Sequence, residues 1–190
     1  MKTDKIITIL IFAATIVCAQ VPFGGFSNFK AFREKTPDVT DTSFRLSVIE
    51  KSVDKNDSDF RLEYRNERGR MKLIREEIAI FADGKNYYIA DGSIGFGSPR
   101  FRKLTCCKNF SYFRRVYSVP SGTGGHSKNN LNEVWVILDH TDGTVSELTD
   151  RVLKQILLRN QPLLYNEYSD KRKRNGSPIE YIKRICSQTN

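Results

Sequence analysis

The spacing of apolar residues changes at Thr149 from a period of two to a helical one, and this change limits the folds that the chain can adopt. From Ser43 up to that point, apolar and polar residues alternate, as at Phe44, Leu46 and Val48, which is typical of a strand with one buried face. After it, apolar residues recur every three or four positions, as in an amphipathic helix that Thr149 would cap. The order predicts an α+β fold: an antiparallel β-sheet or partly open barrel of about six to eight strands, followed by about two to three C-terminal helices.

Four segments are predicted from this pattern. Residues 1–19 form a leader, residues 20–42 an irregular lead-in, residues 43–148 an antiparallel β domain, and residues 149–190 a helical segment packed on the same domain. Without the leader, 190 minus 19 residues leaves 171, which is the size of one ordinary domain.

Two short turns mark hairpins in the β domain. Asp83–Asn86 contains an Asp-Gly pair, which supplies the positive backbone angle of a tight turn, and His140–Gly143 contains a second one. The strand at 133–138 has apolar residues on both of its faces, so we expect both faces to be covered.

The leader has the pattern of a secretory signal peptide. Lys2 and Lys5 precede an apolar run of about twelve residues, which is too short to span a membrane, and small residues follow it. Cleavage between Ala19 and Gln20 would export the mature protein to a periplasm or to the medium. The alternative is a lipoprotein signal, in which a lipidated Cys18 would anchor the chain.

The lead-in carries four phenylalanines: Phe23, Phe26, Phe29 and Phe32. Their spacing of three places them on one side of a short helical stretch. We expect this segment to dock on the domain as a flap or short helix and to contribute its rings to the core.

Three cysteines remain after export: Cys106, Cys107 and Cys186. An oxidising compartment favours pairing, but an odd number leaves one cysteine without an intramolecular partner. A bond from Cys106 or Cys107 to Cys186 is less strained than one between adjacent cysteines. Three buried cysteines without any bond are the alternative.

The chain is basic, with 31 Lys and Arg against 22 Asp and Glu. Two interpretations fit the basic and aromatic segment after residue 99. Arg102, Lys103, Arg114 and Arg115 could bind an anionic polymer, or they could be the solvated face of strands whose rings form the core. Residues 171–174 could likewise grip phosphates or could simply be a solvated helix end.

No pattern predicts a catalytic site, a metal site or a cofactor. Histidine occurs only at His126 and His140, and no spacing of cysteine, histidine or carboxylate residues is typical of a zinc site. The alternative is a hydrolase-like enzyme in which Cys107 pairs with His126 or His140, because such a dyad is spatial and not sequential.

Several segments resemble small exported bacterial proteins of uncharacterised families: Ile80–Ile89, Phe110–Phe113, Asp139–Leu148 and the apolar positions between Leu157 and Ile182. The resemblance implies this architecture and an envelope or extracellular address, and it brings no activity. We therefore expect an exported, noncatalytic domain that binds a protein or another envelope component.

Overall fold

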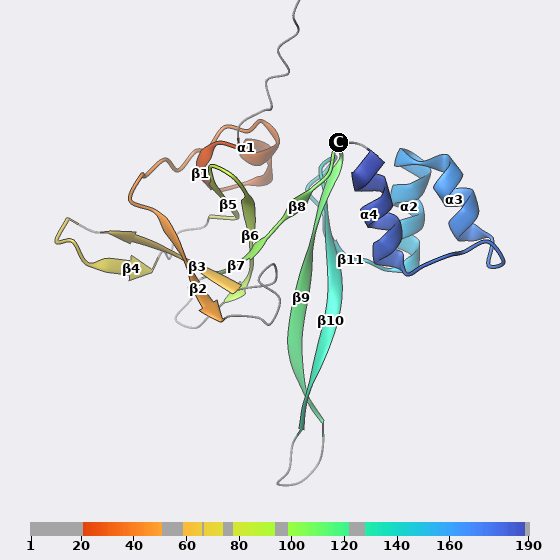
Figure 1. Cartoon of the computed structure of the whole chain (residues 1–190). Coiled ribbons are helices and arrows are strands. Elements are labelled where there is room, and N and C mark those ends of the chain that lie inside the picture. Colours follow the sequence, from red (N-terminus) through yellow and green to blue (C-terminus); the bar gives the residue numbers. More distant parts are fainter. Residues whose placement is uncertain are drawn as a thin grey trace, which may run out of the picture.

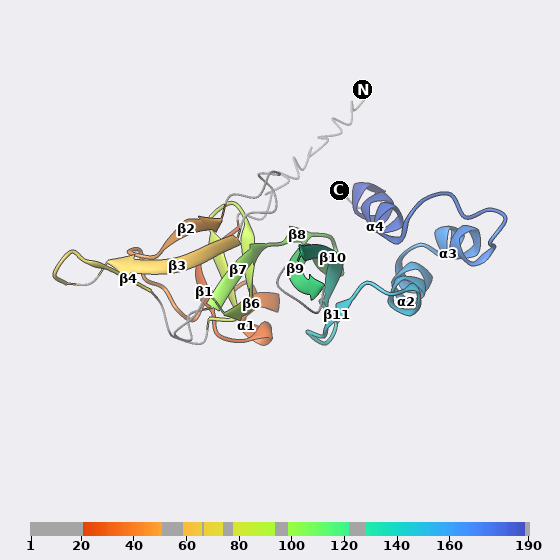
Figure 2. The ribbon, with the colours of Figure 1, turned by 90° about the horizontal axis from the view of Figure 1, so that it is seen from below.

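The chain forms three layers, with a four-stranded sheet between a seven-stranded sheet and a group of helices (Figures 1 and 2). The computed structural model describes residues 21–50, 59–65, 67–73, 78–93, 99–121 and 128–188. Among these residues, no helix has the length and apolar character that a membrane span requires. The leader and His126 lie outside the described residues.

The seven-stranded sheet, called sheet A, follows the order β1-β5-β6-β7-β3-β2, and β4 pairs with β3. Its strands are β1 (Phe23–Phe26), β2 (Arg45–Glu50), β3 (Asp59–Arg65), β4 (Met71–Leu73), β5 (Ile80–Asp83), β6 (Tyr87–Ser93) and β7 (Pro99–Lys103). The predicted hairpin is confirmed between β5 and β6, where Gly84 has φ +88° and Asp83 accepts hydrogen bonds from the Lys85 and Asn86 amides.

The four-stranded sheet, called sheet B, follows the order β11-β10-β9-β8. Its strands are β8 (Thr105–Cys106), β9 (Phe110–Ser121), β10 (Lys128–Asp139) and β11 (Val145–Glu147). The hairpin of β9 and β10 extends beyond both neighbouring layers (Figure 1). Val136 and Leu138 pack towards sheet A, whereas Ile137 packs towards the helices, so both faces of β10 are covered as predicted.

The lead-in is more regular than the sequence indicated, because it contains β1 and the short helix α1 (Phe29–Arg33). Asn28 caps α1 by accepting a hydrogen bond from the Ala31 amide at 3.0 Å. Phe26 and Phe32 are buried between the two sheets. The segment therefore docks on the domain as expected, but only these two rings are buried. Phe29 is half-buried and Phe23 is exposed, and the expectation of one helical face is wrong for Phe23 and Phe26, which lie in β1.

Three helices follow the strands: α2 (Asp150–Asn160), α3 (Pro162–Ser169) and α4 (Pro178–Gln188). Thr149 caps α2 as predicted, with its hydroxyl oxygen accepting from the Val152 amide at 3.3 Å. One apolar face of the helices packs on sheet B through Leu153, Ile156 and Ile182. The α+β class is confirmed, but the strands form two sheets, because a strand that is apolar on both faces needs a layer on each side.

Candidate functional site

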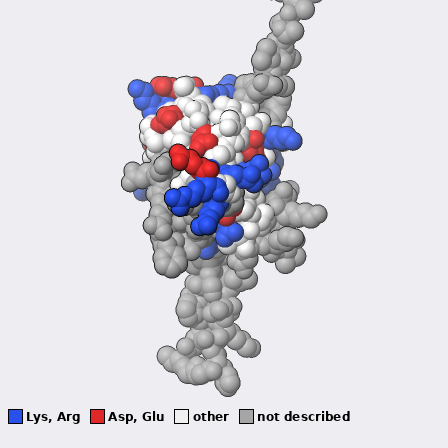
Figure 3. Space-filling model, turned by 90° about the vertical axis from the view of Figure 1, so that its left-hand side faces the viewer, with Lys and Arg blue, Asp and Glu red and all other residues white. Residues whose placement is uncertain are grey.

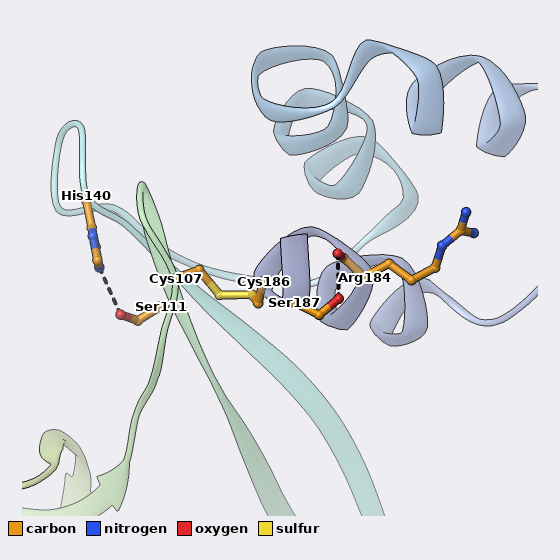
Figure 4. The surroundings of a disulfide bond; sticks show 6 residues. All are labelled: Cys107, Ser111, His140, Arg184, Cys186 and Ser187. Carbon is orange, nitrogen blue, oxygen red and sulfur yellow. Dashed lines mark hydrogen bonds between the residues drawn. A yellow bond between two sulfur atoms is a disulfide. The ribbon is translucent and has the colours of Figure 1, made fainter. Parts of the chain in front are cut away.

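The disulfide between Cys107 and Cys186 joins sheet B to the helices (Figure 4). Cys107 follows β8, Cys186 lies near the end of α4, and their Cα atoms are 5.2 Å apart. Both cysteines are buried in the core that sheet B shares with the helices. The bridge therefore fastens the last helix of the chain to the middle layer.

This bridge decides what Cys107 can do. The thiolate is the nucleophilic form of cysteine, and a sulfur atom in a disulfide has no thiol to ionise. A dyad of Cys107 with His140 therefore has no nucleophile in this structure, and His126 lies outside the described residues.

A polar contact between Ser111 and His140 lies on the other side of β9 (Figure 4). The Ser111 hydroxyl oxygen is 2.8 Å from Nε2 of His140, and the Ser111 side chain is fully buried. Burial lowers the pKa of His140, although a hydrogen bond to the Lys108 backbone opposes this shift. The neutral imidazole donates one N–H to that backbone carbonyl, which leaves Nε2 to accept from Ser111.

The resulting chain of hydrogen bonds connects β9 to the turn after β10. The edge of the His140 ring also packs against Phe32 of α1, at 5.6 Å between ring centroids. Because Ser111 has no exposed surface, a substrate cannot reach its hydroxyl in this conformation. The pair resembles a catalytic dyad in its atoms, but its burial suits a structural role.

Cys106 is the cysteine that the disulfide leaves free, and it is exposed. It lies directly opposite Ser111 in the pairing of β8 with β9. Although part of the residue is exposed to solvent, many protein atoms surround the thiol, and this desolvation raises its pKa; a hydrogen bond with Ser111 only partly opposes the shift. A thiol with a raised pKa is almost entirely protonated at neutral pH, so Cys106 is a weak nucleophile.

The basic segment places its arginines in a network of ion pairs between the two sheets. Arg102 is buried and contacts Asp59 of β3 and Asp91 of β6, each at 2.9 Å. Arg115 of β9 pairs with the same Asp91, which ties sheet B to sheet A. Ionised carboxylates satisfy buried guanidinium groups in this way, so the network is part of the interior.

The other predicted anion-binding residues are placed less deeply. Arg114 pairs with Glu133 at 3.3 Å across the hairpin of β9 and β10. Lys103 lies at the end of β7 and is half-buried. Three of the four predicted residues thus already contact carboxylates, which reduces the positive charge available to an anion.

The described residues contain no group of three or more histidine, cysteine or carboxylate side chains that could hold a metal ion. The acidic turn after β10 is instead held by its own hydrogen bonds. Asp139 accepts from the Thr141 amide and pairs with Arg159 of α2, and Asp142 accepts from the Thr144 amide at 2.9 Å. These contacts are those of a turn stabilised by aspartate side chains.

The sequence did not indicate the two pairings that organise this region. Ser111 was not a candidate residue, and no local pattern connects it to a histidine 29 positions away. The aspartates that bind Arg102 also come from separate strands. Comparisons with models of protein families, with curated proteins and with solved structures find no match to the chain.

Proposed function

We propose that the chain is an exported, noncatalytic domain that binds another protein or a component of the cell envelope. The observation that carries this proposal is the Cys107–Cys186 disulfide. Disulfides persist in oxidising compartments outside the cytoplasm, as the leader also predicts. The same bond occupies the cysteine that the hydrolase alternative would need as its nucleophile.

The other polar groups of the interior support the proposal for the same reason. The neutral His140 accepts a hydrogen bond from a buried serine, and Arg102 is held between two aspartates. These groups have their partners inside the molecule, which suits a role in stability, and leaves the surface as the part that can bind another component.

The proposed export is tested by expressing the full sequence in a bacterium and measuring the mass and the first residue of the product in each cell fraction. Cleavage before Gln20 is the expected result. A lipid-modified Cys18 in the membrane fraction would instead identify a lipoprotein. A cytoplasmic product that keeps Met1 would contradict export.

The binding part is tested by crosslinking the tagged, exported protein in its native envelope and identifying the captured components by mass spectrometry. An untagged strain gives the background, and enrichment of the same component in repeated captures is expected. Capture of nothing above background would contradict a binding role. Hydrolysis of ester or peptide substrates that a Cys106→Ser variant loses would favour an enzyme instead.

A further inference from the structure

One end of the helical layer gathers segments that are far apart in the sequence. α2 begins, α3 ends and α4 begins at this end (Figure 1). The Tyr168 hydroxyl donates to Asp150 at 2.7 Å, and Arg174 Nε donates to the Tyr168 carbonyl at 3.0 Å. The Arg174 guanidinium also lies over the Tyr168 ring, 3.9 Å from its centroid. These contacts hold the first turn of α2 against the connection between α3 and α4.

These contacts bring the basic residues of the two segments to the same end of the helical layer, which we call the basic end. Its cations are Arg151 and Lys154 of α2, and Lys171, Arg172, Lys173 and Arg174 of the connection. The neighbouring carboxylates are Asp150, Asp170 and Glu180. Six cations against three carboxylates leave a net charge of +3 on this end of the molecule.

The carboxylates are used within the basic end. Asp150 pairs with Lys154 at 2.9 Å and with Arg174 at 3.3 Å, and Asp170 pairs with Lys173 at 3.5 Å. Glu180 accepts hydrogen bonds from the Ser177 amide and hydroxyl at the start of α4.

Three cations remain for an external partner. Arg151, Lys171 and Arg172 are exposed, and none of them forms an ion pair within the part of the chain that the structure describes. The α2 segment and the α3–α4 connection both contribute to this set, so the free charge belongs to the folded surface and not to one basic run.

We propose that the basic end docks on the anionic phospholipid surface of a membrane, an inference that rests on the proposed export. At this end the connection between α3 and α4 extends away from the two sheets, so a flat bilayer can approach it (Figures 1 and 2). A single-stranded polymer would instead need a groove with exposed rings for stacking. The rings at this end, Tyr168 and Tyr181, are buried.

The opposite side of the molecule lacks such an excess of cations. On the face of sheet A in Figure 3, Lys and Arg side chains lie among Asp and Glu side chains. A surface that carries both charges is attracted only weakly to a negatively charged bilayer. The basic end is therefore the part that we expect to meet the membrane.

The expected effect of each free cation follows from its attraction to anionic lipid. One basic side chain near such a surface strengthens binding about fivefold, and the attraction falls off within a Debye length of about 10 Å at moderate salt. Neutralising Lys171 and Arg172 together should weaken binding about 25-fold.

The test uses the exported protein, purified with its disulfide intact, and vesicles of phosphatidylcholine with or without phosphatidylglycerol. Co-sedimentation gives the vesicle affinity for the wild type, for Lys171→Gln/Arg172→Gln and for Arg151→Gln. Lys30→Gln/Arg33→Gln on α1 is the matched control, because it removes the same charge from exposed positions far from the basic end. Thermal melts establish that all variants fold alike.

We expect salt-sensitive binding to the anionic vesicles alone, about 25-fold weaker for the double variant, about fivefold weaker for Arg151→Gln and unchanged for the control. Absent vesicle binding, or an equal loss in the control, would overturn the proposal. An unchanged affinity of Arg151→Gln would overturn the inference that both segments form one surface.

Two further arms separate the sources of phosphate. Competition by inorganic phosphate at constant ionic strength would indicate a site for a single phosphate, and binding to polyphosphate without vesicle binding would indicate a polymer; either result overturns membrane docking. The vesicle assay uses purified protein and is independent of the export test, which determines the first residue of the exported chain. Failure of docking and failure of export can therefore be told apart.

Discussion

The Cys107–Cys186 disulfide should account for a large share of the stability of the exported protein. The two cysteines are 79 positions apart, and the loop between them contains most of sheet B and all three C-terminal helices. In the chain-entropy model, closing a loop of this length restricts the unfolded chain by about 4.5 kcal/mol at 25 °C. Because denatured chains are already compact, we expect the loss on removing the bridge to be about 3–4 kcal/mol.

The perturbation is Cys107→Ser/Cys186→Ser, compared with wild type in urea with and without dithiothreitol. If the free energy of unfolding falls with a slope of about 2 kcal/mol per molar urea, this loss lowers the urea concentration at the unfolding midpoint by about 1.5–2 M. The slope itself should rise, since an unfolded chain without the crosslink exposes more surface. Wild type in reductant should behave like the double variant, which reductant should not change.

Cys106→Ser is the matched control, because it removes a cysteine outside the bridge. Its midpoint should fall on addition of dithiothreitol as much as that of wild type. Sensitivity to reductant that disappears in Cys106→Ser would mean that Cys106 forms the bridge. A wild-type midpoint that reductant does not move would refute the stabilising role of the loop closure.

Three other perturbations test the interior and the helices. Arg102→Met removes the buried guanidinium that Asp59 and Asp91 share; because Arg100 and Arg115 still pair with these aspartates, we expect a loss of about 1–3 kcal/mol in urea unfolding, and an unchanged midpoint would contradict the proposed network. Gly143→Ala should cost about 1–3 kcal/mol, because Gly143 has φ +79° and an added Cβ would lie 2.6 Å from the Phe29 ring; an unchanged melting curve would contradict that close approach. Hydrogen bonds from Arg184 and Tyr181 lower the pKa of Glu167 to about 2, so the stabilisation they provide is complete above pH 4.5 and is lost as pH falls towards 2. In Arg184→Gln, an NMR titration should give a higher Glu167 pKa, and an unchanged midpoint would argue against this ion pair.

The sequence predicted those features of the fold that depend on local periodicity. The change of period at Thr149 placed the start of the helices, because a capping residue and an apolar stripe are both local signals. The turn at Asp83–Asn86 was predictable for the same reason. The apolar residues on both faces of β10 also predicted that this strand lies between two layers.

Contacts between distant strands were beyond this kind of inference. The partners of Arg102 come from β3 and β6, and their approach depends on the strand order of sheet A. The basic end likewise requires α2 and α3 to pack antiparallel, so that the first turn of α2 lies beside the connection between α3 and α4. A pattern along one segment contains neither fact. For this reason the sequence favoured solvated charge for these residues but left anion binding open.

The choice between Cys106 and Cys107 shows how one strand position can decide the chemistry of a protein. Neighbouring residues at a strand point to opposite faces of the sheet. Cys106 lies opposite Ser111 and close enough to Tyr87 of sheet A to contribute, after burial, to the raised pKa of that tyrosine. Cys107 instead lies in the core shared with the helices. Sheet B therefore keeps the free thiol apart from the core that holds the disulfide. A shift of β8 by one residue would exchange the free cysteine and the bridged cysteine. The pairing of β8 with β9 excludes this shift, whereas the Cys-Cys sequence alone does not.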